Sequence, residues 1–576
     1  MILFLLWRRP PDPQADPDPA RVAATLQEIF APLFEVPPPI RTLQNDHVTL
    51  VSLELPVRGW KAPYFEEDRR TWALAPDYPI NARAVLVARG TDSDDDGVLP
   101  ALGRGLEADP DGHLRDLTPP FSLIWSDKAT GATFAQNDGL GQSQLYEWEE
   151  GRSWALTNKV AALRALGCPL EPVPEQWAVR ATLGWFPLDL TGYRGVRFVE
   201  PGTRLQIDLD GLRRTPHDVL SGWVRPGTSK RQDGLELARA SLHEHLAAAR
   251  SLCERPSLGL TGGWDSRAVA AAARAVGVRF SARVRGLPGR PDVRIASELA
   301  RVAGLDLRVK ASGGLPPDSP DACRRSIRLA LLWQAGHMVS RRHKTFLAGR
   351  PHLDGGDVNI MGQHGELVRG FYAKEIAAAG RSVAEGEPAW LDVFMSWVPA
   401  AIRPALHEPI RQALSMAFRR ADRFGLTGRA RFDFFYLMED TRRWASGSLA
   451  SQPGVVVAPF LNPGMIRAGF GDPADDLTDN PFHRHIIEAD APEWKDIPYA
   501  EDLEPAAEGG WKQPVGKQNY DSTLYWRSVG RPIIRDAFSR GGFWTEVYDP
   551  DLAREGWADS PDDFAIAHSL PDVLRT

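Results

Sequence analysis

Short apolar runs separated by turn-forming residues dominate the first part of the chain. Such runs predict β-strands, and the apolar start of the chain, MILFLLWRR, is expected to be a buried first strand. Two runs at residues 121–125 and 133–136 flank a turn at 127–131 and predict a hairpin. The other strands of this part are expected at residues 48–53, 84–88 and 205–208.

Near residues 215–230 the pattern changes to apolar strands that alternate with amphipathic helices. Residues 234–249 carry apolar side chains at helical spacing. The strands expected next, with the helices that follow them, are 258–260 with 267–276 and 279–284 with 293–302. Strands separated by helices predict a parallel sheet, which binds ligands at the carboxyl ends of its strands. Beyond about residue 321 helices should predominate, at 329–337, 390–406, 410–423 and 432–445.

Composition narrows the class of protein. The chain has 576 residues, of which 43% are apolar and 25% charged, as in water-soluble globular proteins of about two to four domains. The net charge of −7, without a long basic run, gives no footprint for nucleic acid. No segment reaches the roughly 20 apolar residues that span a membrane, and the apolar start is too short for a signal peptide. Three cysteines are too few for a disulfide framework, which favours the cytoplasm.

A glycine turn follows the strand expected at 258–260, in the stretch SLGLTGGWDSR at residues 257–267. Backbone amides of such a turn and the N-terminus of the next helix suit a phosphate group. No lysine follows the glycines, so the stretch is not the loop that transfers a γ-phosphate. An ordinary loop with a helix cap is the alternative. The residues expected to line a nucleotide are Leu260, Thr261, Gly262, Gly263, Trp264, Asp265 and Ser266.

This turn resembles the S/T-G-G-x-D-S pyrophosphate loop of ATP pyrophosphatases, which cleave ATP into AMP and pyrophosphate. Two later segments, GQHGELVRG at 362–370 and APFLN at 458–462, the latter after Arg442 and Arg443, follow in an order and spacing similar to the asparagine synthetase family. The resemblance implies an ATP-pyrophosphatase-like parallel-sheet synthetase domain at residues 221–576, with a helical C-terminal part. It also implies ATP and Mg²⁺ as cofactors.

The first part resembles the glutamine amidotransferase domain of the same family, an N-terminal-nucleophile (Ntn-type) sandwich of α-β-β-α layers. The matching stretches are DGLG at 138–141, ALTN at 155–158 and EPGT at 200–203. The resemblance places this domain at residues 1–220. Such a glutaminase attacks with an N-terminal cysteine, but Ile2 stands here and the first cysteine is Cys168. We therefore expect a degenerate domain without glutaminase activity.

Without ammonia from glutamine, the attacking amine is expected to come with the substrate. Two branches of the family fit this expectation, namely β-lactam-forming synthetases and the cyclases of lasso peptides. We favour lasso-type macrocyclisation, in which a peptide's side-chain carboxylate is adenylated and its own amine attacks. The expected partners are a peptide or small carboxylic acid, with a precursor peptide and leader-processing proteins. An ammonia-using asparagine synthetase and a non-catalytic nucleotide-binding scaffold remain alternatives.

Asp265 is the expected Mg²⁺ ligand, its alternative being a helix cap. Gly362 is expected to let the backbone approach the adenylate closely. Val284 either touches the adenine or is a buried strand residue. Asp292 is expected to cap the helix that follows it rather than to face the site.

Glu366 is the expected catalytic carboxylate, which orients or deprotonates the amine. The alternative is a surface ion pair with Arg369. Gly365 stands where the family has a second magnesium-binding Asp. Two alternatives follow: Asp354 or Asp357 substitutes from the preceding loop, or the site holds magnesium with fewer carboxylates.

The family also needs a late catalytic lysine that neutralises charge in the transition state. Lys517 is preferred because Gly516 beside it suits a closing loop, and Lys512 is the second candidate. The aromatic residues at 494–499 and Trp511 either shape a peptide groove or belong to the core. Asn462 replaces the family's Asp and is expected to affect only local packing.

Overall fold

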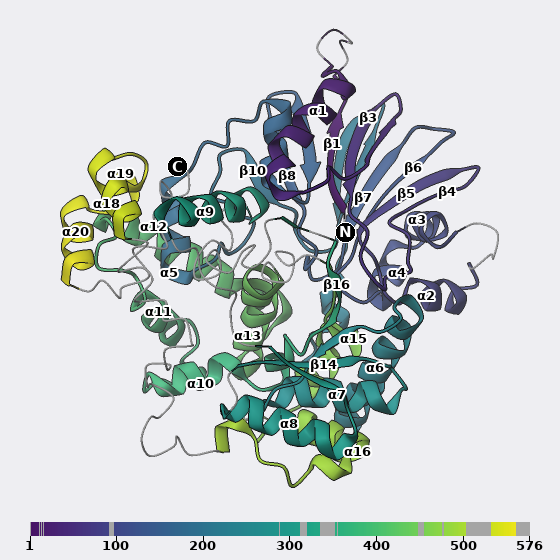
Figure 1. Cartoon of the computed structure of the whole chain (residues 1–576), viewed down its shortest axis with the longest axis vertical. Helices are drawn as coiled ribbons and strands as arrows, with labels where there is room; N and C mark the ends of the chain where they lie inside the picture. Colours follow the sequence, from purple (N-terminus) through teal and green to yellow (C-terminus); the bar gives the residue numbers. More distant parts are fainter. Residues whose placement is uncertain are drawn as a thin grey trace.

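The computed structural model describes residues 2–10, 12, 14, 16–91, 97–286, 289–310, 319–334, 352–353, 355–446, 454–474, 477, 479–502 and 531–559. Within these residues the chain forms two six-stranded antiparallel sheets from residues 2–216 and a five-stranded parallel sheet from residues 257–457. Figure 1 shows the antiparallel sheets in its upper part and the parallel sheet with its helices below them. The predicted mixed α/β class and the parallel sheet are confirmed.

The first antiparallel sheet is built around the apolar start of the chain, as predicted. Its order is β10-β8-β9-β1-β3-β2. The strands are β1 (Ile2–Arg8), β2 (Ile40–Gln44), β3 (Val48–Glu54), β8 (Tyr146–Glu150), β9 (Ser153–Thr157) and β10 (Val196–Phe198). Alternate side chains of β1 enter two different cores: Leu5 packs with Leu26 of helix α1 (Pro19–Phe30), whereas Phe4 packs with Leu74 of the second sheet. The strand is thus buried on both faces.

The second antiparallel sheet has the order β12-β11-β7-β6-β5-β4. Its strands are β4 (Phe65–Glu67), β5 (Thr71–Asp77), β6 (Ser122–Asp127), β7 (Thr133–Asn137), β11 (Thr203–Asp208) and β12 (Gly211–Pro216). Helices α2 (Ala82–Ala88), α3 (Val98–Ala108) and α4 (Pro110–Asp116) share a core with it. The layers therefore follow the order helix, sheet, sheet, helix. The hairpin predicted at 121–136 is confirmed as β6 and β7.

The strand predicted at 84–88 is wrong, because these residues belong to helix α2. A short apolar run does not by itself distinguish a strand from one buried helical turn. Ala82, Val85 and Leu86 lie on one helical face and enter the core. The burial of that face explains why the helix forms here.

The parallel sheet has the order β15-β14-β13-β16-β17. Its strands are β13 (Ser257–Gly259), β14 (Ser281–Arg285), β15 (Leu307–Lys310), β16 (Asp357–Ile360) and β17 (Gly454–Val457). From β13 the chain builds outward to β14 and β15, and then returns to the other side of β13 with β16 and β17. The order therefore reverses between β13 and β16, and such switch points are where open α/β sheets bind ligands.

Helices surround this sheet and fill the rest of the chain. Those nearest the sheet are α6 (Arg231–Leu252), α7 (Trp264–Ala275), α8 (Pro291–Ala303), α15 (Pro463–Gly471) and α16 (Pro481–Asp490). The others include α9 (Pro320–Gln334), α10 (Phe371–Ala378), α11 (Glu387–Met395), α12 (His407–Arg419), α13 (Gly428–Phe435), α18 (Arg531–Arg540), α19 (Trp544–Val547) and α20 (Pro550–Asp559). A π-helical segment, Tyr436–Ala445, continues α13. The single helix predicted at 390–406 is wrong beyond Met395, where Pro399 and Pro404 interrupt it.

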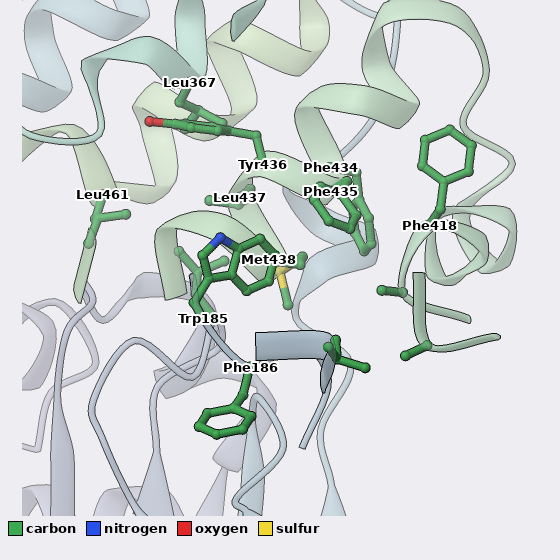
Figure 2. Close-up of a cluster of buried hydrophobic side chains, with 14 of the residues drawn as sticks. Trp185, Phe186, Leu367, Phe418, Phe434, Phe435, Tyr436, Leu437, Met438 and Leu461 are labelled. Carbon is green, nitrogen blue, oxygen red and sulfur yellow. The ribbon is translucent and has the colours of Figure 1, made fainter. Parts of the chain in front are cut away.

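The two parts of the chain share one buried core. Figure 2 shows Trp185 and Phe186 of the first part in the same apolar cluster as Phe435 and Met438 of the second. Polar contacts accompany this packing. Arg443 Nε donates to the carbonyl of Phe186 (2.8 Å), and Glu439 accepts from the backbone N–H of Leu188 (2.6 Å).

Among the described residues no helix has the length and apolarity that crossing a bilayer requires.

Candidate functional site

Two loops meet at the switch point of the parallel sheet. One is the glycine turn between β13 and α7, and the other follows β16 and begins at Gly362. A Cβ atom at position 362 would lie 2.7 Å from the backbone nitrogen of Ser266 and 2.8 Å from the carbonyl carbon of Asp265. Only glycine therefore lets the second loop rest against the first turn of α7. Gly362 thus approaches the start of α7 closely, whereas its predicted approach to an adenylate stays a prediction.

The hydroxyl groups of the glycine turn close the turn on itself. Thr261 Oγ1 accepts from the N–H of Gly263 (3.1 Å) and lies 2.8 Å from Ser266 Oγ, which accepts from the N–H of Thr261 (3.0 Å). Helix α7 starts at Trp264, and no side chain caps it. Asp265 is therefore not the cap that the alternative interpretation required. An uncapped helix N-terminus suits an anion.

Neighbouring segments fix the turn from outside. Asp292 Oδ1 accepts from the N–H of Gly262 (2.9 Å), and the carbonyl of Gly262 accepts from the N–H of Ala500 (2.9 Å). The prediction that Asp292 caps its own helix is wrong, because α8 has no side-chain cap and the carboxylate is used across the loop instead. The ring of Trp264 stacks on Tyr499, with 3.5 Å between ring centroids.

Asp265 lies at the centre of a cluster of charged and polar groups. Its Oδ1 is 2.8 Å from His483 Nε2, and its Oδ2 is 3.5 Å from Arg369 Nη1. A Cβ atom at position 365 would overlap Asp265 Oδ1 and lie 2.6 Å from its Cγ. Gly365 is therefore required by the position of Asp265. An aspartate at 365 would not fit this arrangement.

Glu366 is brought to the same place by the loop after β16. Tyr436 Oη donates to Glu366 Oε2 (3.1 Å). Burial and the nearby charge of Asp265 raise the pKa of Glu366 to about 7. Arg369 is not simply a surface partner of Glu366, because its Nε donates to Asn480 Oδ1 (2.6 Å) while its other end approaches Asp265.

The donor set fits a metal ion that arrives with a polyphosphate. Within the described part of the chain, no group of three His, Cys, Asp or Glu side chains could hold a metal alone. Mg²⁺ is commonly bound by one or two carboxylates together with substrate phosphates, and Asp265 offers one such carboxylate beside the glycine turn. Asp357 cannot replace the family's second Asp, because it lies at the opposite end of β16 and pairs with Arg58 (2.9 Å). Asp354 lies outside the described residues.

Other predicted residues have structural positions. Val284 is 1% exposed and packs in the apolar core with Leu260, so the buried-strand interpretation applies to its side chain. Trp494 is likewise core and donates to the carbonyl of Leu299 (3.1 Å). Asn462 caps α15 and donates to the carbonyl of Ser241 (3.0 Å), which confirms its packing role. Lys512, Lys517 and Trp511 lie outside the described residues.

Sequence reasoning missed two residues of this cluster, Tyr436 and His483. Neither belongs to a motif segment, and both come from helices that the pattern gave no reason to place here. Arg442 and Arg443 precede the motif segment at 458–462, but they do not belong to this cluster. Both side chains are buried against the first part of the chain rather than at the site.

The first part of the chain holds no activated thiol among its described residues. Ile2 is buried in β1, and its carbonyl accepts from Asn158 Nδ2 (2.8 Å). Burial raises the pKa of Cys168, and in the second part it raises that of Cys253 to about 11. A nucleophilic cysteine needs the opposite shift.

Comparison with known proteins gives limited guidance. No family model matches the chain, and no curated protein sequence matches it. One similar solved structure is described as the allosteric regulatory enzyme of purine biosynthesis (14% identity, 55% of this chain and 82% of that chain, TM-score 0.27). Another is glutamine phosphoribosylpyrophosphate amidotransferase from B. subtilis (13% identity, 54% and 65%, TM-score 0.25). At TM-scores this low the likeness does not define the fold.

The contact at Gly362 yields a direct test. Gly362→Ala should displace the first turn of α7 and weaken the MgATP binding that the sequence predicts at least about tenfold, or ~1.4 kcal/mol. The matched control is Gly259→Ala. Gly259 is the last residue of β13, and a Cβ atom there would meet nothing within 4 Å. Isothermal titration of both folded variants checks this, and equal affinities would contradict it.

Proposed function

We propose that the protein is an ATP-dependent, AMP-forming carbon–nitrogen ligase, which adenylates a carboxylate and joins it to an amine of the substrate. The observation that supports this most is the convergence of Asp265 and Glu366 at the carboxyl edge of the parallel sheet. They lie beside a glycine turn and an uncapped helix N-terminus, a combination suited to polyphosphate. Two carboxylates held close together repel each other, so a loop with a structural role alone would gain nothing from them.

In this proposal the glycine turn and the start of α7 bind the pyrophosphate portion of ATP. Asp265 holds the Mg²⁺, and Leu260, Val284 and Gly362 form the floor of the nucleotide site through their backbone. When bound, the metal ion neutralises phosphate charge and orients the α-phosphate for attack by the carboxylate. Lys517, or else Lys512, completes the neutralisation of the leaving pyrophosphate.

Glu366 takes the proton from the attacking amine. A carboxylate with a pKa of about 7 is a competent base near neutral pH, because about half of it is ionised there and it accepts a proton readily. The hydrogen bond from Tyr436 fixes its orientation. The base is thus held in place by a tyrosine that is itself buried in the helical part of the chain.

The proposed substrate is a peptide whose side-chain carboxylate is activated and whose own amine attacks, as in lasso-type macrocyclisation. This is supported by Cys168, the first cysteine of the sequence: burial raises the pKa of its thiol, so it is a poor nucleophile for the release of ammonia from glutamine. A precursor peptide and leader-processing proteins would be its partners. The first part of the chain would act as a scaffold that supports the synthetase part.

ATP–pyrophosphate exchange tests the proposal. With Mg²⁺ and peptides that carry Asp or Glu, the protein should exchange pyrophosphate into ATP, and glutamine should not be hydrolysed. Exchange with free aspartate, with product formation from ammonium, would instead favour an ammonia-using synthetase. Tight ATP binding without exchange for any acid would favour a nucleotide-binding scaffold.

Asp265→Asn should lower the exchange rate by about 10²–10³-fold or more, because it removes the charge that holds the metal ion at the pyrophosphate. Asp357→Asn is the matched control, since Asp357 lies on the same sheet but at the amino end of β16. It should leave exchange within about twofold, as exposed ion pairs contribute little. Equal loss in both variants would assign the effect to the fold of the sheet.

Glu366→Gln should separate the two half-reactions. The amide oxygen of glutamine still accepts from Tyr436, so adenylation measured by exchange should persist. Amide formation should fall by about 10²–10⁴-fold, because the amide cannot take a proton. Single-turnover measurement of the cyclic product checks this. Unchanged product formation would remove Glu366 from the mechanism.

A further inference from the structure

His483 is a buried imidazole that the proposed function does not yet use. It lies on α16, which packs against α7, and its side chain is 0% exposed. Its ring also lies near that of Phe460, with 5.2 Å between centroids. Among the described residues neither ring nitrogen has a hydrogen-bond partner. Buried polar groups without partners are rare in folded proteins and call for an explanation.

The Nε2 atom of His483 makes no hydrogen bond to any described residue, but it has a close polar neighbour among them. It lies 2.8 Å from Asp265 Oδ1, which also has no hydrogen-bond partner in the described part of the chain. The two atoms are thus within hydrogen-bond distance but not aligned for one. Two ligands at right angles on an octahedral ion, each about 2.1 Å from it, lie about 3 Å apart. The separation of the two atoms is close to that of adjacent ligands on one metal ion.

Charge at the site is compatible with a divalent cation. Asp265 and Glu366 bring two carboxylates, and Arg369 brings one guanidinium group, which lies on the Oδ2 side of Asp265. Oδ1 remains directed toward His483. Asp265 can therefore bind a metal ion through Oδ1 without losing its contact with Arg369.

We propose that Asp265 Oδ1 and His483 Nε2 together bind the metal ion that accompanies the nucleotide, and that this ion is a divalent first-row transition metal such as Mn²⁺ in preference to Mg²⁺. First-row transition metals accept an imidazole nitrogen more readily than Mg²⁺ does, and Mn²⁺ shares with Mg²⁺ the affinity for carboxylate and phosphate oxygens, so Mn²⁺ suits a site that has both kinds of donor. The inference rests on the proposed function for the presence of a polyphosphate. It changes the identity of the ion and adds a ligand from a helix outside the motif segments.

Pulsed electron paramagnetic resonance of Mn²⁺ bound with pyrophosphate tests this inference. Pyrophosphate contains no nitrogen, so a directly bound ¹⁴N must come from the protein. The native protein should show a ¹⁴N coupling, and His483→Gln should lose it. His485→Gln is the matched control on the same helix, because His485 faces Glu236 at 3.2 Å and should not affect the signal.

Affinity gives a second measurement. Loss of a residue that only orients a metal ligand weakens binding about 10–100-fold, so loss of His483 should weaken Mn²⁺ binding by at least as much. Mg²⁺ binding should weaken less in His483→Gln, so the ratio of the Mn²⁺ affinity to the Mg²⁺ affinity should fall.

The outcomes separate the two proposals. Mn²⁺ bound to the native protein without a ¹⁴N coupling, or with a coupling that survives in His483→Gln, overturns the role of His483. Neither result affects ATP–pyrophosphate exchange, which tests the ligase proposal. Failure of the native protein to bind Mn²⁺ with pyrophosphate overturns this inference, and absence of exchange as well overturns the ligase proposal.

Discussion

The close packing of two loops at the switch point of the parallel sheet is the constraint on which the candidate site depends. Gly362 touches the backbone at the start of α7, and Gly365 touches the side chain of Asp265. A larger residue at position 362 would push the loops apart, and one at 365 would displace the side chain of Asp265. The two glycines therefore keep Glu366 buried and close to Asp265, and burial, together with the charge of Asp265, raises the pKa of Glu366. Because positions 362 and 365 carry no side chain, the two loops and the charged residues on them can lie close together.

A second, buried set of contacts joins this site to the first part of the chain. Glu439 accepts from Arg420 (2.9 Å) and from the backbone of Leu188, while Arg443 donates to Phe186. Buried charges are tolerated only when paired in this way. The same continuous helix carries Tyr436, whose hydroxyl holds Glu366. The helix thus contacts both the first part of the chain and the site, and so links the two.

The sequence predicted the parts of the fold that depend on local pattern. The buried first strand, the 121–136 hairpin and the strand–helix alternation around the glycine turn could all be derived from it. The helix at Ala82–Ala88 could not, because a short run in which all residues but Arg83 are apolar suits either type of element until its burial is known. The same limit applied to Asp292, whose partner Gly262 lies on another loop. His483 and Tyr436 reach the site only through tertiary packing of helices, which has no local pattern.

Transfer of ¹⁸O from a labelled substrate carboxylate would show directly whether the carboxylate is adenylated. Adenylation joins a carboxylate oxygen to the α-phosphorus of ATP, and attack by the amine then leaves that oxygen on AMP. We expect each turnover to release AMP carrying one ¹⁸O atom, together with unlabelled pyrophosphate. Release of ADP with ¹⁸O in orthophosphate, or of AMP without label, would contradict this expectation.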